Sequence, residues 1–173
     1  KRFRAYGLTA IIIGIFFLVV LFFSIIRSGL PAFTHTVVEM EFTLTQAQYD
    51  EAEDQLFKTK AYSNLFIAQL QQQLQERGME VEFDEAAIER LLGKVGGNLR
   101  EYYAGNQNRL GEPVQFSLSA SSRVDGYFNG RVTRESMQDS RFLMASDLDL
   151  VDALRNAGII KSEFNWNFIT GAD

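Results

Sequence analysis

Residues 5–26 read AYGLTAIIIGIFFLVVLFFSII, an uninterrupted run without a charged side chain. In a helix that rises 1.5 Å per residue, these 22 residues extend about 33 Å, enough to cross a hydrocarbon core of about 30 Å. A cleaved signal peptide has a shorter apolar region and small residues at its cleavage site, whereas Ile26 and Arg27 end this run. The sequence therefore predicts a retained transmembrane helix over residues 5–27.

The charges on either side of the run indicate its direction across the membrane. Three of the first four residues are basic, whereas after Arg27 the next basic residue is Lys58. Basic residues accumulate on the cytoplasmic side of membrane helices. We therefore expect residues 1–4 to form a cytoplasmic stub and residues 28–173 to form a periplasmic domain.

The composition after the apolar run is that of a folded, acidic domain. The chain is 46% apolar and 23% charged, which is typical of a globular protein, and about 146 residues suit one compact domain. Four of the 17 lysines and arginines lie before residue 28, which leaves 13 against all 22 acids and a net charge of −9. Such a surface repels nucleic acid. The absence of cysteine excludes a thiolate metal site or nucleophile.

Alternating apolar and polar residues predict two clear strands in the external domain. The alternation occurs at 38–44 and again at 114–118, and it is typical of strands with one buried face. Near the chain end, Phe164, Trp166 and Phe168 alternate in the same way. This aromatic segment indicates an extended exit that either packs in the core or returns to a membrane interface.

Helices are predicted between and after these strands. Thr45 begins a Thr-x-x-Gln capping box for a helix near Gln46, and Asp84 is the expected N-cap of a later helix. Further helical segments are expected at 61–77, 85–92, about 98–103, after a turn at 121–125, and at 147–157. Because helices and strands do not alternate regularly, the predicted class is α+β: one N-terminal transmembrane helix followed by a single mixed α+β extracytoplasmic domain.

Three motifs suggest chemistry but have simpler explanations. His35 is the only histidine, so a Ser-His-Asp site or a metal site would depend on it alone. The aspartates at 147, 149 and 152 lack the spacing of a calcium loop and fit the first turn of a helix. The glycine-rich segment 93–97 lacks the Gly-Lys-Ser/Thr ending of a nucleotide-binding loop, which favours a helix-breaking connection.

Two polar clusters are further candidates for a site. An arginine cluster could hold an anion, but the acids interleaved with it favour local ion pairs. The arginines are Arg123, Arg131, Arg134 and Arg141, and the acids are Asp125, Glu135 and Asp139. Five glutamines on the helix at 61–77 are interpreted as a solvated face: Gln69, Gln71, Gln72, Gln73 and Gln75. We therefore predict a non-catalytic domain without catalytic, cofactor-binding or metal-binding residues.

Short sequence phrases along the chain carry a family resemblance. They are RFRAYGL at 2–8, GxxAF at 29–33, Ser121 with Val124, Asp125, Tyr127 and Gly130, AGIIK at 157–161, and FNWxF at 164–168 followed by GxD at 171–173. Together they resemble phosphate ABC transporter permease subunits of the PstA type, in the bacterial subgroup that has a domain inserted after the first membrane helix.

The resemblance implies a multi-pass inner-membrane subunit of an importer for inorganic phosphate. Its expected partners are the lipid bilayer, a second permease subunit, cytoplasmic ATPase subunits and a periplasmic phosphate-binding protein. The permease core and the ATPase contacts would follow residue 173, so residues 1–173 are expected to be a fragment without transport residues. The alternative is a single-pass membrane-anchored sensor or scaffold, which would lack further apolar helices after residue 173.

Overall fold

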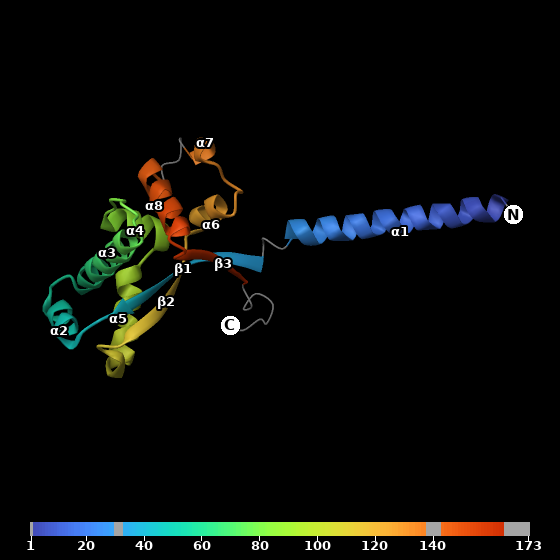
Figure 1. The fold of residues 1–173 in the computed structure, drawn as a ribbon. Coiled ribbons are helices and arrows are strands. Elements are labelled where there is room, and N and C mark those ends of the chain that lie inside the picture. The colour runs from blue at the N-terminus through green and yellow to red at the C-terminus, as the bar shows by residue number, and fades with distance from the viewer. Residues whose placement is uncertain (1, 30–32, 138–142, 165–173) are drawn as a thin grey trace. The chain divides into compact units, whose positions relative to one another are not determined.

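The computed structural model describes residues 2–29, 33–137 and 143–164 (Figure 1). It has a mixed α+β fold, as predicted, with one apolar N-terminal helix followed by a small domain that contains a sheet. The chain divides into two compact units. One contains the first helix, and the other, residues 35–163, contains the sheet and the remaining helices.

Helix α1 runs from Arg2 to Gly29 and contains the predicted membrane segment. From Tyr6 to Gly29 its mean hydropathy reaches 3.0, and none of this window is buried against protein. Side chains such as Phe22 and Phe23 are about two-thirds exposed, at 66% and 65%. Since this much apolar surface is unfavourable in water, the length and composition of α1 suit it to a lipid environment.

The sheet has three strands in the order β2-β1-β3. The central strand β1 (Thr34–Thr43) pairs antiparallel with β2 (Pro113–Ser119), in a register that places Met40 opposite Phe116. The alternating residues predicted to face inward are buried on both strands except Phe116, which is half-buried, while Gln115, Ser117 and Ser119 of β2 are exposed. One face of the sheet therefore packs against the helices and the other carries polar side chains.

The third strand lies earlier than the predicted extended exit. It is β3 (Ile160–Phe164), and it begins soon after α8 (Ala145–Asn156) ends. At the start of β3, the Glu39 N–H donates to the Ile159 carbonyl at 2.8 Å, and at its end Phe164 stacks on Phe33. Strand β3 thus runs antiparallel to β1 and pairs with only the first half of β1. Trp166 and Phe168 lie outside the described residues.

The helices follow the predicted capping signals closely. Thr45 forms the capping box of α2 (Gln46–Asp54) with Gln48, and Asp84 accepts a bond from the Ala87 N–H at 2.8 Å to cap α4 (Glu85–Leu92). The long α3 (Lys58–Glu76) begins three residues before its predicted start. The remaining elements are α5 (Val95–Gly105), the 3₁₀ turn η2 (Gln107–Arg109), α6 (Ser122–Phe128) and α7 (Arg134–Met137).

Aromatic and aliphatic side chains join the helices to the sheet in one core. Phe42 of β1 is fully buried and lies within about 6 Å, ring centre to ring centre, of Phe66, Tyr103 and Phe116. Aromatic pairs at this spacing contribute beyond the area that they bury. The cluster therefore fixes α3 and α5 on the same face of the sheet.

Candidate functional site

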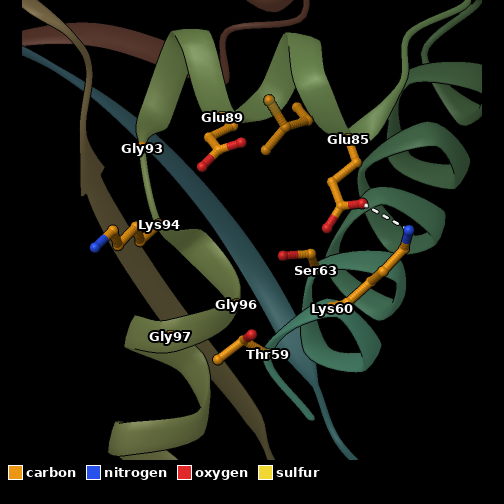
Figure 2. A pocket seen from close by; sticks show the side chains of 10 residues that line it. Thr59, Lys60, Ser63, Glu85, Glu89, Gly93, Lys94, Gly96 and Gly97 are labelled. Atoms are coloured by element: carbon orange, nitrogen blue, oxygen red, sulfur yellow. Dashed lines mark ion pairs between the residues drawn. The ribbon is translucent and has the colours of Figure 1, made fainter. Parts of the chain in front are cut away.

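The glycine-rich segment lines a pocket between three helices. The pocket has a volume of about 370 Å³, and its polar lining comes from Thr59, Lys60, Ser63, Glu85, Glu89 and Lys94 (Figure 2). Gly93 ends α4 with a positive φ of 72°, and α5 begins at Val95, not near Asn98 as predicted. The segment is a connection between two helices, as predicted, but Gly96 lies inside the second helix.

Gly96 is required by the close approach of α5 to α3. A Cβ atom at this position would lie 2.0 Å from the Thr59 carbonyl oxygen and 2.5 Å from Ser63 Oγ, whereas one at Gly97 would meet its nearest neighbour at an ordinary 3.9 Å. Backbone atoms on α3 cannot yield as a flexible side chain can. The sequence pattern that resembles a phosphate loop is therefore explained by helix packing.

The charges around this pocket do not converge on a common point. Lys60 forms an ion pair with Glu85 at 3.5 Å, and Glu89 adds a second carboxylate to the same wall. Figure 2 shows the Lys94 side chain pointing away from Lys60 and Ser63. With one lysine paired and the other directed elsewhere, the pocket has no concentrated positive field for an anion.

A second group of charges locks α2, α3 and α5 together around Glu53. Its carboxylate accepts two bonds from Arg100, at 2.8 and 3.2 Å, one from Lys58 at 2.9 Å and one from the Tyr62 hydroxyl at 3.2 Å. The hydrogen bonds from Arg100 and then Lys58 lower the pKa of Glu53 to about 2. Burial, with the nearby Glu53 charge, raises the pKa of Tyr62 above its usual range. These bonds serve packing, since all four polar groups satisfy one another.

The three aspartates at the start of α8 separate into two structural roles. Asp147 is fully buried and accepts from Arg90 Nε at 2.7 Å and Nη2 at 2.8 Å, and also from the Met144 N–H. Asp149 and Asp152 instead accept from Arg134, at 2.8 and 2.6 Å. The structural interpretation of this cluster is supported, because its carboxylates bind two different arginines.

The arginine cluster pairs with acids, although not always with the interleaved ones. Arg131 pairs with Asp125 as predicted, and Asp125 also accepts from the buried Thr36 hydroxyl at 2.6 Å. Arg134 reaches past its sequence neighbour Glu135 to α8. Arg123 lies in α6. Arg141 and Asp139 lie outside the described residues.

His35 lies near the beginning of β1, half-buried, and its Nδ1 is buried without a hydrogen-bond partner. Within the part of the chain that the structure describes, no three His, Asp or Glu residues are arranged to hold a metal ion.

The glutamine-rich face of α3 is only partly solvated, which corrects the sequence interpretation. Gln72 and Gln75 are exposed, as expected for a solvated face. Gln69, however, bonds both backbone groups of Thr43: its Oε1 accepts from the N–H at 3.0 Å and its Nε2 donates to the carbonyl at 2.6 Å. Gln73 Nε2 likewise donates to the Glu41 carbonyl at 2.6 Å.

These glutamines border a polar groove along the open edge of β1. The groove has a volume of about 710 Å³, and its walls include Glu39, Glu41, Gln69, Gln73, Glu76 and Arg77. The sequence offered one signal for it. Residues 69 and 73 directly precede the buried Leu70 and Leu74, so they flank the apolar stripe and are close enough to reach the sheet.

An exposed apolar pair marks the connection between α2 and α3. Leu56 is 88% exposed and Phe57 is 69% exposed. Single exposed apolar residues are common on proteins, but two adjacent large ones at a tight connection offer a contact point for another molecule. This pair was not among the predicted site residues, although Leu-Phe between two polar helical segments was a visible signal.

Comparison with known proteins identifies a family for this chain. The family described as "Domain of unknown function (DUF3333)" matches residues 1–138, which is most of the chain. No curated protein and no solved structure matches it. The match includes α1, the glycine-rich pocket and all of the groove beside β1 except Gly158.

Proposed function

The chain belongs to the DUF3333 family, and we propose that it is the N-terminal region of an inner-membrane permease subunit of an ABC importer for inorganic phosphate. In this proposal α1 is the first membrane helix of the subunit. Residues 35–163 then form a periplasmic interaction module without catalytic activity. The transport assignment is supported by the resemblance of the phrases at 2–8, 29–33 and 164–168 to permeases of the PstA type.

The direction of insertion is supported by charge. Three of the first four residues are basic, and no acid occurs before Glu39. The positive-inside tendency then favours a cytoplasmic N-terminus and a periplasmic domain. An acidic surface suits a domain that stands clear of anionic lipid headgroups, because like charges repel.

The interaction role rests on one observation, the exposed Leu56–Phe57 pair. The charged clusters of the domain are used internally: Glu53 joins α2, α3 and α5, and Asp147 joins α8 to α4. The apolar pair has no such internal use, since most of its surface faces solvent. In an importer, the second permease subunit or the phosphate-binding protein would be the molecule that contacts it.

Phosphate uptake by cells tests this proposal. We expect Leu56→Ser with Phe57→Ser, introduced into the chromosomal gene, to reduce high-affinity uptake several-fold while the amount of protein in the membrane stays the same. Gln75→Ser, at another exposed position, is the matched control and should leave uptake unchanged. Normal uptake after deletion of the whole gene would contradict the transport assignment, whereas normal uptake with the double variant alone would contradict only the role of the apolar pair.

A further inference from the structure

The central strand of the sheet has an edge that is only half covered. On the side that faces β3, the Glu39 N–H is bonded to the Ile159 carbonyl. Before Ile159 the chain turns away at Gly158, whose φ is 70°. Because alternate residues of a strand direct their backbone groups to the same side, Glu41 and Thr43 face this side too, beyond the reach of β3.

Side-chain amides occupy the place of a neighbouring strand along this open segment. One amide carries a donor and an acceptor, as a residue of a strand does, and Gln69 uses both on Thr43. Gln73 supplies a donor to the Glu41 carbonyl. Unlike a strand backbone, these amides can rotate away without unfolding α3, and a strand that replaced them would restore the same bonds.

The groove beside this edge is acidic. Glu39, Glu41 and Glu76 line it, and Arg77 is the one basic residue among the lining residues that the structure describes. Because Glu39 is paired with Lys161 at 2.8 Å, the negative charge offered to a partner comes from Glu41 and Glu76. Glu41 and Glu76 are exposed. Exposed sheet edges in proteins are often guarded by lysine, whereas carboxylates here would attract a basic chain and repel a second copy of this acidic one.

We propose that an extended, basic segment of a partner polypeptide binds in this groove as a fourth strand, beside Glu41 and Thr43. Its backbone takes over the bonds made by Gln69 and Gln73, and its lysines or arginines lie near Glu41 and Glu76. Addition of a strand to an open edge is an established way to bind an extended peptide, in which backbone bonds give affinity and side chains give selectivity. This inference does not depend on the transport assignment.

Peptide titration of the full chain in a non-ionic detergent tests the proposal. The probe is a fluorescent seven-residue peptide in which lysine alternates with threonine and valine. A second peptide has glutamate in place of lysine, and a third keeps the lysines but carries N-methyl groups on the residues that face the strand. We expect the basic peptide to bind about tenfold or more tightly than either of the others, because it alone has both the charge and the backbone donors.

Matched charge reversals locate the binding site. Glu41→Lys with Glu76→Lys should weaken the basic peptide about tenfold or more, whereas Glu80→Lys with Glu82→Lys, which changes the net charge equally at exposed positions outside the groove, should have little effect. Of these four positions, only Glu41 lies in the sheet. Circular dichroism of both variants verifies that they fold.

Several results would overturn the proposal. Equal binding of the N-methylated peptide would mean that charge alone holds it, and equal effects of the two charge reversals would mean that no particular site is used. Gln69→Ala with Gln73→Ala should bind the basic peptide at least as tightly as the unchanged chain, and weaker binding would show that the glutamines hold the peptide instead of yielding to it. Self-association of the chain that Glu41→Lys with Glu76→Lys abolishes would assign the groove to a second copy.

Discussion

Helix α3 borders both the glycine-rich pocket and the groove beside β1, and its contacts differ in kind at the two places. Near the start of the helix, α5 approaches so closely that Gly96 contacts backbone atoms of Thr59. Farther along, the gap between α3 and β1 is bridged by the side chains of Gln69 and Gln73. The first contact can change only if helices move, whereas the second can change by rotation of side chains. A glycine-rich pocket is thus part of the framework, and a glutamine-bordered groove is the more adaptable surface.

The strongest test of this comparison is a side chain at the closed contact. We expect Gly96→Val to cost more than about 3 kcal/mol in the free energy of unfolding, because a Cβ would overlap the Thr59 carbonyl and force α3 and α5 apart. Denaturant unfolding of the full chain in detergent, followed by circular dichroism, measures the change.

Gly97→Ala is the control for that substitution. Its Cβ would meet only ordinary contacts, and replacing glycine by alanine inside a helix stabilises by up to about 1 kcal/mol. Equal destabilisation by both variants would show that the helix start tolerates no side chain at all, and the specific contact with Thr59 would lose its importance.

A second expected effect depends on pH. The pKa of Glu53 is lowered from its ordinary value of 4.5 to about 2 by its bonds to Arg100 and Lys58. A carboxyl with a lowered pKa in the folded state contributes stability that is complete above pH 4.5 and lost as the pH falls toward 2. Glu53→Gln should therefore cost about 1–2 kcal/mol at pH 7, and the cost should shrink below pH 4.5.

Unfolding of the two chains at pH 7, 5, 4 and 3 measures this difference. Glu51→Gln serves as the control, since Glu51 lies exposed on the same helix. A cost for Glu53→Gln that stays constant across this range would mean that its bonds, and not its charge, join α2 to α3 and α5.

The third effect concerns the open edge of β1 and should be smaller. Gln69→Ala should cost about 1 kcal/mol, because the Thr43 backbone can bond water in the groove instead. Amide exchange at Thr43 should become faster while exchange at buried Phe42 stays slow. Gln72→Ala, which removes only an exposed bond to Glu76, should alter neither. Unchanged exchange at Thr43 would show that the glutamine does not protect the edge.

Local signals in the sequence predicted most helices and strands well. Contacts between residues far apart in the sequence could not be predicted. The capping residues Thr45 and Asp84 act within three residues of themselves, so their helices were predicted closely. Most of strand β3 was not predicted, because Ile160–Phe164 has little alternation and is stabilised by pairing with β1. The bonds from Gln69 to Thr43 likewise join residues 26 positions apart, and no spacing in the sequence shows them.

The glycine-rich pocket provides the last prediction, an expected absence of effect. Phosphate should not bind there measurably at micromolar concentrations, although the segment 93–97 opens a helix, and helix starts can bind anions. Lys60 is already paired with Glu85, Glu89 adds a negative charge, and Gly96 is packed against α3. Local hydrogen bonds to an anion can outweigh an unfavourable net charge, so the negative charge of the domain does not by itself exclude phosphate binding. The expected absence of binding rests instead on the pairing of Lys60 with Glu85.

Calorimetric titration of the full chain with inorganic phosphate at moderate salt measures this affinity, with Glu85→Gln as the second protein. The substitution frees Lys60 and removes a carboxylate from the wall, so any latent phosphate site should bind more tightly in this variant. We expect no heat of binding from the unchanged chain and at most millimolar affinity from Glu85→Gln, because freeing one lysine still leaves Lys94 directed away from the pocket. A micromolar dissociation constant for the unchanged chain would make this pocket a phosphate receptor and would reverse the comparison between the two clefts.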